Sequence, residues 1–146
     1  MAKPRLYFDR NVGRCVPEAL RLLGLDVIHH NTPRSFLGLK NLGKQRTLFA
    51  DKERDDVWLE YVGTQGWIVF TQDRKFHKEG FENEMSAIKQ FNVGCFYIWG
   101  AEATRWEKMK ALCRGLDAML VAASLTTKPF IFDVNRHGKL KSIPIP

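Results

Sequence analysis

One apolar run, Trp67 to Phe70, most strongly constrains how this chain can fold. Its four residues are β-branched or aromatic, which predicts a strand buried on both faces, as in the middle of a mostly parallel sheet. The run stops abruptly at Thr71, Gln72 and Asp73. A carboxylate just past the carboxyl end of a central parallel strand lies where open α/β sheets bind ligands, although a plain solvated turn explains the same residues.

Strands and helices alternate along the rest of the chain. Expected strands cover 5–8, 25–30, 67–71 and 95–99, and expected helices cover 17–23, 57–65 and 82–91, with a further helix after Thr104. Residues 130–134 and 140–143 flank a turn and predict a hairpin at the sheet edge. This order predicts one domain over residues 1–146, with a three-layer α/β/α fold around a largely parallel sheet. If the first strand lies between the second and the Trp67 strand, Asp9 and Asp73 meet at the topological switch point.

Several distinctive residues are interpreted as structural. Thr104 and Glu107 form the pattern of a capping box, followed by an apolar stripe that predicts a core-facing helix: Trp106, Met109, Cys113, Leu116 and Leu120. The three cysteines, Cys15, Cys95 and Cys113, show no paired spacing and are expected to be small buried side chains in a reducing compartment. His29 and His30 lack the spacing of a metal site.

The balance of charge indicates the class of partner. A formal net charge of +7 and a pI near 9.5 favour polyanions, with nucleic acid preferred, although the charge is also explained by solubility alone. No apolar run approaches the roughly 18 residues of a membrane span. The basic start, Lys3 to Arg5, passes directly into a strand, so no signal peptide is expected and the predicted location is the cytoplasm.

The segment from Asn31 to Thr47 has no clear period and no acidic residue. Loops of this length inside compact domains are usually functional or mobile. Cations interleaved with an aromatic ring suit single-stranded nucleic acid, with phosphates at the cations and a base on Phe36. The predicted RNA contacts here are Arg34, Lys40, Lys44 and Arg46, with a merely solvated loop as the alternative.

Three carboxylates are expected to approach one another. Asp9 and Asp73 end neighbouring strands, and Asp55 begins the helix that feeds the Trp67 strand. Two unit charges about 4 Å apart repel by roughly 4 kcal/mol at an effective dielectric of about 20, so such a cluster needs a cation. An all-oxygen ligand set suits Mg²⁺ or Mn²⁺ and metal-assisted phosphodiester hydrolysis. The alternatives are that Asp55 is a helix N-cap, that Asp9 holds a turn, or that Asp56 replaces Asp55 as the ligand.

Three motifs in this order resemble those of a known family. A strand ending in Asp9-Arg10-Asn11 is followed by an amphipathic helix, then by Asp55 with Trp58 three residues later, then by Val69 to Lys75. The pattern is similar to that of the PIN-like nucleases, and within them to the small stand-alone VapC-type toxins. The resemblance covers roughly Leu6 to Trp99.

The resemblance implies a Mg²⁺- or Mn²⁺-dependent endoribonuclease, often the toxin of a toxin–antitoxin pair. Asp9, Asp55 and Asp73 would be its metal ligands and catalytic residues. Arg10, Arg74 and Lys75 are predicted RNA phosphate contacts for a separate reason, since they are cations beside the acidic residues. An antitoxin protein would be the partner, and a homodimer is left open. Typical PIN domains carry a further acidic residue between the first and second ligands, where only Asp51 or Glu53 can substitute here. The competing interpretations are a binding module that has lost catalysis and, more weakly, a receiver-like signalling domain.

Overall fold

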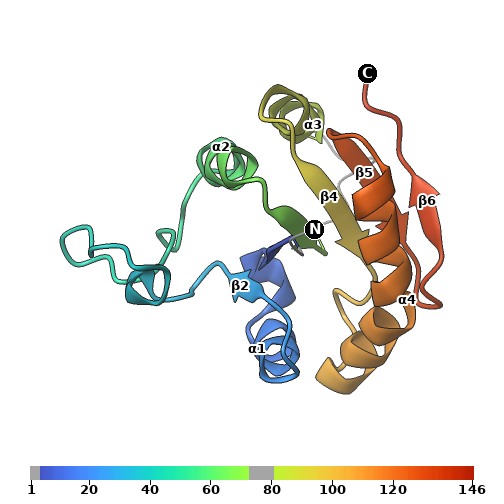
Figure 1. Ribbon diagram of the computed structural model, residues 1–146, viewed down its shortest axis with the longest axis horizontal. Coiled ribbons are helices and arrows are strands. Elements are labelled where there is room, and N and C mark those ends of the chain that lie inside the picture. The colour runs from blue at the N-terminus through green and yellow to red at the C-terminus, as the bar shows by residue number, and fades with distance from the viewer. Residues whose placement is uncertain (1–3, 73–80) are drawn as a thin grey trace.

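The computed structural model describes residues 4–72 and 81–146 (Figure 1). A six-stranded sheet has the order β2-β1-β3-β4-β5-β6, in which every neighbouring pair is parallel except β5 and β6. Its elements are β1 (Leu6–Phe8), α1 (Cys15–Leu22), β2 (Val27–His29), α2 (Asp55–Gln65), β3 (Ile68–Thr71), α3 (Phe81–Gln90), β4 (Gly94–Ile98), α4 (Arg105–Leu125), β5 (Phe130–Val134) and β6 (Leu140–Ser142). The predicted α/β fold with a C-terminal edge hairpin is confirmed.

The three layers follow from alternation along the buried strands. In β1, Tyr7 belongs to the core on the α2 and α3 side, whereas Leu6 and Phe8 belong to the core on the α1 and α4 side. Strand β3 repeats this pattern, since Val69 faces α2 and its neighbours face the other way. Figure 1 shows α2 and α3 along the upper side of the sheet, with α1 and α4 on the other. Because helices cover both faces of the sheet, every side chain of a continuous apolar strand is buried against one layer or the other.

An aromatic ladder crosses the sheet on the α1 and α4 side. The ring of Phe8 stacks on that of Phe70 with centroids 4.7 Å apart, Phe70 lies 5.4 Å from Phe96, and Phe96 lies 5.6 Å from Phe132. Adjacent parallel strands hold equivalent residues side by side, so these rings pack in register across β1, β3, β4 and β5. The ladder ties the four central strands into one unit.

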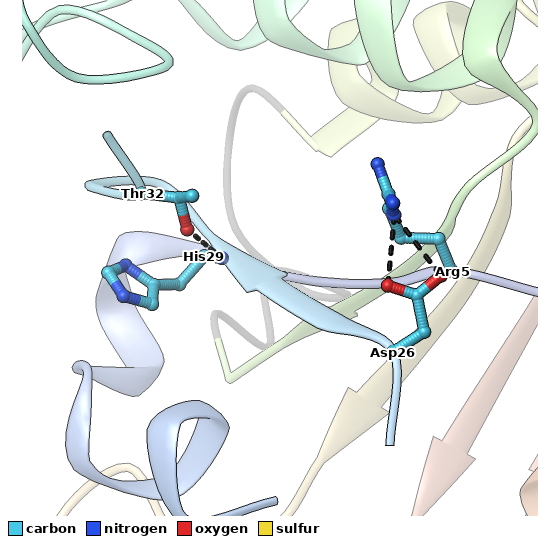
Figure 2. Close-up of polar contacts among 4 residues, drawn as sticks. All are labelled: Arg5, Asp26, His29 and Thr32. Atoms are coloured by element: carbon cyan, nitrogen blue, oxygen red, sulfur yellow. Dashed lines mark hydrogen bonds and ion pairs between the residues drawn. The ribbon is translucent and has the colours of Figure 1, made fainter. Parts of the chain in front are cut away.

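Strand β2 is shorter than predicted, and polar contacts flank it (Figure 2). Before it, Arg5 Nε lies 3.1 Å from Asp26 Oδ1. At its end, the His29 amide donates to Thr32 Oγ1 at 2.9 Å, which turns the chain out of the sheet. These bonds satisfy backbone and side-chain groups where the parallel ladder stops.

The long loop is more ordered than its sequence suggests. It contains a 3-10 helix, Arg34–Leu37, and two antiparallel bridges, Pro33 to Thr47 and Leu42 to Gln45. Its end is pinned because Leu48 and Phe49 are buried in the core beside α2. Figure 1 shows the loop projecting from the β2 edge of the sheet, away from α4.

Helix α4 begins as predicted but faces the sheet differently. The capping box is present, with both the Thr104 side chain and the Glu107 side chain bonded to the opposite backbone amide. The predicted stripe is wrong at Trp106, which is 69% exposed, and at Cys113. Helix α4 instead buries Leu112, Gly115 and Met119, so the face that it turns to the core is rotated relative to the predicted stripe. Cys15 is also exposed, so the prediction of buried cysteines is confirmed only for Cys95.

Candidate functional site at the carboxyl edge of the sheet

The strand order reverses at β1, which lies between β2 and β3. Asp9 follows β1 at this switch point, as predicted. Its Oδ1 accepts a hydrogen bond from the Arg10 amide at 2.8 Å, and its Oδ2 accepts one from the Thr71 hydroxyl at 3.2 Å. Asp9 therefore caps the 3-10 helix Arg10–Val12, so the turn-holding role and the placement at the edge are both present. Two bonds orient the carboxylate without using all of its lone pairs.

Asn11 joins the ends of β1 and β3. Its Nδ2 donates to Thr71 Oγ1 at 2.9 Å, and its Oδ1 accepts from the Gln72 amide at 3.1 Å. Asn11 and Thr71 therefore position Asp9, a role that was not predicted from the sequence. Nothing local signals this role, because the partners are 60 residues apart and meet only through the parallel pairing of β1 with β3.

Asp55 is the first residue of α2, and its Oδ1 accepts a hydrogen bond from Trp58 Nε1 at 3.0 Å. The N-cap position is held by Arg54, so the alternative of Asp55 as N-cap is wrong. The neighbouring Asp56 is exposed and pairs with the Arg54 guanidinium at 2.9 Å. The buried indole of Trp58 orients Asp55, which explains the spacing of these residues in the sequence.

Burial and nearby charge act together on Asp9 and Tyr7. Burial raises the pKa of Asp9, and the negative charge of Asp55 raises it further, while the Arg10 amide and His30 act in the opposite direction. Burial also raises the pKa of Tyr7 well above its ordinary value, with Asp9 and Asp55 both contributing. Asp9, Asp55 and Tyr7 thus share one electrostatic environment. The ionised form of Asp9 is disfavoured unless a cation compensates it.

A buried tyrosine–histidine pair lies beneath the carboxylates. Tyr7 Oη is 3.0 Å from His30 Nδ1, and His30 Nε2 is 3.0 Å from the carbonyl oxygen of Ala50. Since a carbonyl only accepts, His30 Nε2 carries a proton, and in the neutral ring the Tyr7 hydroxyl donates to Nδ1. These two hydrogen bonds link β1, the end of β2 and the loop before α2, and so fix the elements that carry Asp9 and Asp55.

The structure leaves part of the expected site untested. Asp73, Arg74 and Lys75 lie outside the described residues. Within residues 4–72 and 81–146, no group of three histidine, cysteine, aspartate or glutamate side chains is arranged to hold a metal ion. Asp9 and Asp55 supply hard carboxylate oxygen donors, which fit a divalent cation, and a third ligand at Asp73 stays a prediction.

The predicted RNA contacts divide into two kinds. Arg10 is exposed beside Asp9, and Lys40, Lys44 and Arg46 are exposed on the loop. Arg34 is different, since its Nε donates to the Lys40 carbonyl at 2.7 Å and its Nη1 to the Leu48 carbonyl at 3.1 Å. Its guanidinium therefore holds the loop together, and its charge is directed into the loop.

A further polar side chain ends β3. Gln72 is 4% exposed, and its Nε2 donates to the Trp99 carbonyl at 3.2 Å. Its Oε1 is buried and has no hydrogen-bond partner within the described part of the chain. Buried polar groups without partners are uncommon in folded proteins, and they concentrate at functional sites.

Comparisons with known proteins agree with this architecture. Residues 4–100 match a family model described as a PIN like domain. Searches of curated proteins and of solved structures found no match. No helix in the described ranges is both long and apolar enough to cross a bilayer. The matched segment contains β1 to β4 together with Asp9 and Asp55, and the chain belongs to the PIN-like domain family, whose fold is generally that of a nuclease.

Proposed function

We propose that this protein is a Mg²⁺- or Mn²⁺-dependent endoribonuclease that hydrolyses RNA phosphodiester bonds. The observation that carries the proposal is the half-buried Asp9 carboxylate at the switch point, whose pKa is raised by desolvation and by Asp55. A fold that retains an unfavourable charge at its ligand-binding edge is organised around a cation. The net charge of +7 supports a polyanionic substrate.

Each residue has a defined part in this mechanism. Asp9, Asp55 and Asp73 would hold the cation, which when bound supplies an activated water and stabilises charge on the scissile phosphate. The Thr71 hydroxyl and the Arg10 amide keep the Asp9 oxygens in place, and Trp58 does the same for Asp55. Phosphates beside the site would be bound by Arg10, which is exposed, and by Arg74 and Lys75, which lie outside the described residues.

The biological assignment within this proposal is the toxin of a type II toxin–antitoxin pair acting in the cytoplasm. Its support is the resemblance of the Asp9, Asp55 and Asp73 motifs to the VapC-type toxins. The protein partner would be a cognate antitoxin, and self-association into a homodimer is compatible with it. Slowed growth on expression of the intact protein, relieved by Asp9→Asn, is the expected outcome.

The test is cleavage of total cellular RNA by the purified protein with Mg²⁺ or Mn²⁺. We expect EDTA to stop cleavage and Asp9→Asn to abolish it while RNA binding persists, because a metal ligand acts mainly in the transition state. Asp26→Asn is the matched control, since Asp26 forms an exposed ion pair before β2. Total RNA includes tRNA and ribosomal RNA, so intact RNA with both metals would refute the enzyme.

One observation favours a second candidate, a PIN-like module that binds RNA without cutting it. Residues 31–50 contain no acidic residue, although typical PIN domains carry one between the first and second ligands. A pure binder has no turnover to lose. Its signature would be RNA affinity that is unchanged by EDTA, with no cleavage product at any metal concentration.

A further inference from the structure

A basic hollow of about 390 Å³ lies between α4 and the turn that joins β5 to β6. It is lined by Trp99, Glu107, Lys110, Arg114, Arg136 and His137. The turn follows the carboxyl end of β5, and α4 begins after the carboxyl end of β4. The hollow therefore opens on the same edge of the sheet as Asp9, and all of its lining residues except Trp99 lie beyond the segment that matches the family, residues 4–100.

The hollow is built by a close contact between glycines. A Cβ atom on Gly115 would lie 2.9 Å from the Gly138 Cα, so only two glycines allow α4 and the turn to approach this closely. The contact places Arg136 beside α4, where Arg114 Nη1 donates to the Arg136 carbonyl at 3.3 Å. The Arg136 guanidinium in turn donates to His137 Nε2 at 3.2 Å. These cations are held by the fold.

The positive charge of the hollow is not cancelled within it. Glu107 is its one lining carboxylate, and Glu107 Oε1 accepts the Thr104 hydroxyl at 2.8 Å and the Thr104 amide at 3.4 Å. The Glu107 carboxylate therefore caps the N-terminus of α4. Lys110, Arg114 and Arg136 leave the lining with a net positive charge, which is complementary to a phosphate.

An exposed aromatic ring continues the hollow along α4. Trp106, Lys110 and Arg114 are spaced four residues apart, which puts them in one row on the helix. Trp106 is 69% exposed, and Lys110 Nζ lies 5.8 Å from the centre of its ring. A flat ring beside a row of cations is the arrangement that binds an unpaired base next to its phosphate.

A second hollow, of about 510 Å³, connects this surface to the proposed active site. It shares Trp99 and Glu107 with the basic hollow and reaches Gln72, the residue after Thr71. The two hollows thus follow the carboxyl edge of the sheet from β3 to the β5–β6 turn. A strand of RNA lying at Asp9 can continue along them.

We propose that the hollow between α4 and the β5–β6 turn is a phosphate-binding subsite for single-stranded RNA, with Trp106 stacking an adjacent base. The identity of the ligand as RNA rests on the proposed function. The subsite itself rests on the cations Lys110, Arg114 and Arg136, on a carboxylate that caps α4, and on an exposed ring outside the segment that matches the family.

The test measures equilibrium binding of a single-stranded oligouridylate in EDTA, in an Asp9→Asn background so that cleavage plays no part. Lys110→Gln with Arg136→Gln removes two charges from the hollow. The control, Lys89→Gln with Lys128→Gln, removes two charges at the opposite edge, where both amines donate to backbone carbonyls. We expect the hollow variant to lower the log–log salt slope by about 1.4, since each single-strand phosphate contact contributes about 0.7.

Trp106→Ala should weaken binding by roughly 5- to 150-fold with the salt slope unchanged, because stacking does not release counterions. Equal slopes for the hollow variant and the control would overturn the subsite, as would a parent protein that does not bind the oligonucleotide. Cleavage is scored separately with the unsubstituted site. If the protein with an intact Asp9 does not cleave RNA but the hollow variant shows the expected fall in salt slope, the nuclease is refuted and the subsite is kept. If that protein cleaves RNA but the salt slope does not fall, only the subsite is refuted.

Discussion

Gly115 on α4 and Gly138 in the β5–β6 turn face each other so closely that a Cβ on Gly138 would lie 2.7 Å from the Gly115 Cα. Gly138 also has a φ of +79°, a conformation that favours glycine. The pair fastens the C-terminal hairpin to α4 and so determines the shape of the basic hollow. Two small residues far apart in the sequence thereby decide where Arg136 stands.

Replacement of Gly115 by Ala tests this contact. The added methyl group meets backbone atoms of Gly138, which cannot rotate away as a side chain does. Overpacking costs about 1–3 kcal/mol, against about 1 kcal/mol gained from the better helix former, so we expect a net loss of up to about 2 kcal/mol in urea unfolding. Cys113→Ala, at an exposed position on the same helix, is the control. A gain of about 1 kcal/mol, the full benefit of the better helix former, would show that α4 and the turn separate freely.

Asp9 should destabilise the metal-free protein at neutral pH. Its folded-state pKa is raised above the ordinary 3.8, so the folded state binds the proton more tightly than the unfolded state. The free energy of unfolding therefore falls as the pH rises from the unfolded-state pKa of Asp9 through its folded-state pKa. Asp9→Asn removes the charge and should raise the melting temperature in EDTA.

The same substitution should reduce stabilisation by metal. A saturating ion at 100 times its dissociation constant adds about 2.7 kcal/mol by mass action. We expect Mn²⁺ to raise the melting temperature of the parent and of Asp26→Asn, and to raise that of Asp9→Asn much less. An undiminished response in Asp9→Asn would place the metal elsewhere.

Trp58→Phe tests the orientation of Asp55. It deletes the indole N–H that binds Asp55 Oδ1 and leaves an aromatic ring in the core. Loss of an outer-shell partner typically lowers metal affinity by about 10- to 100-fold, which a Mn²⁺ titration of the melting temperature would detect. Trp67→Phe makes the same chemical change in the same core cluster and should leave Mn²⁺ affinity unchanged. Similar losses in both variants would indicate general loosening of the core.

The loop cations should separate into a structural and a binding class. Arg34→Lys removes the forked contacts to the Lys40 and Leu48 carbonyls, and bonds from charged groups contribute about 1.5–3 kcal/mol each, so stability should fall. Replacing Lys40, Lys44 and Arg46 together by Gln should leave the unfolding free energy unchanged. If these cations bind phosphates, the salt slope of RNA binding should fall by about 0.7 for each. A slope that falls only with Arg34→Lys would reverse the assignment.

His29 should make stability fall in mild acid. Burial lowers its pKa below 6.5, more than the Glu18 carboxylate 3.4 Å from Nε2 raises it. The unfolded state therefore binds the proton more tightly than the folded state. The free energy of unfolding is highest above pH 6.5 and decreases as the pH falls from 6.5 through the folded-state pKa of His29. His29→Gln should flatten this dependence between pH 7.5 and 5 in urea titrations. The exposed His137→Gln is the control, and a parent-like slope in His29→Gln would exclude His29 as the cause.

Local chemistry was enough to predict the elements. The run Trp67 to Phe70 is a buried central strand, Gly66 ends α2 with a φ of +73°, and Thr104 caps α4, since each depends on neighbours a few residues away. The alternation of strands and helices predicted the parallel sheet and the position of Asp9 at its switch point. Side-chain orientation on α4 was mispredicted because apolar residues occur on more than one face of this helix, and only packing decides which face is buried.

The amino-acid sequence alone determined the order of elements, the positive charge and the placement of Asp9 and Asp55 at element ends. Their surroundings form only when the layers pack: Thr71 and Asn11 lie beside Asp9, Tyr7 pairs with His30, and Gly115 and Gly138 close the hollow. These contacts join residues more than 20 positions apart. Hydrogen bonds and close packing depend on distances of a few tenths of an ångström, which arise when layers pack and which no local pattern encodes.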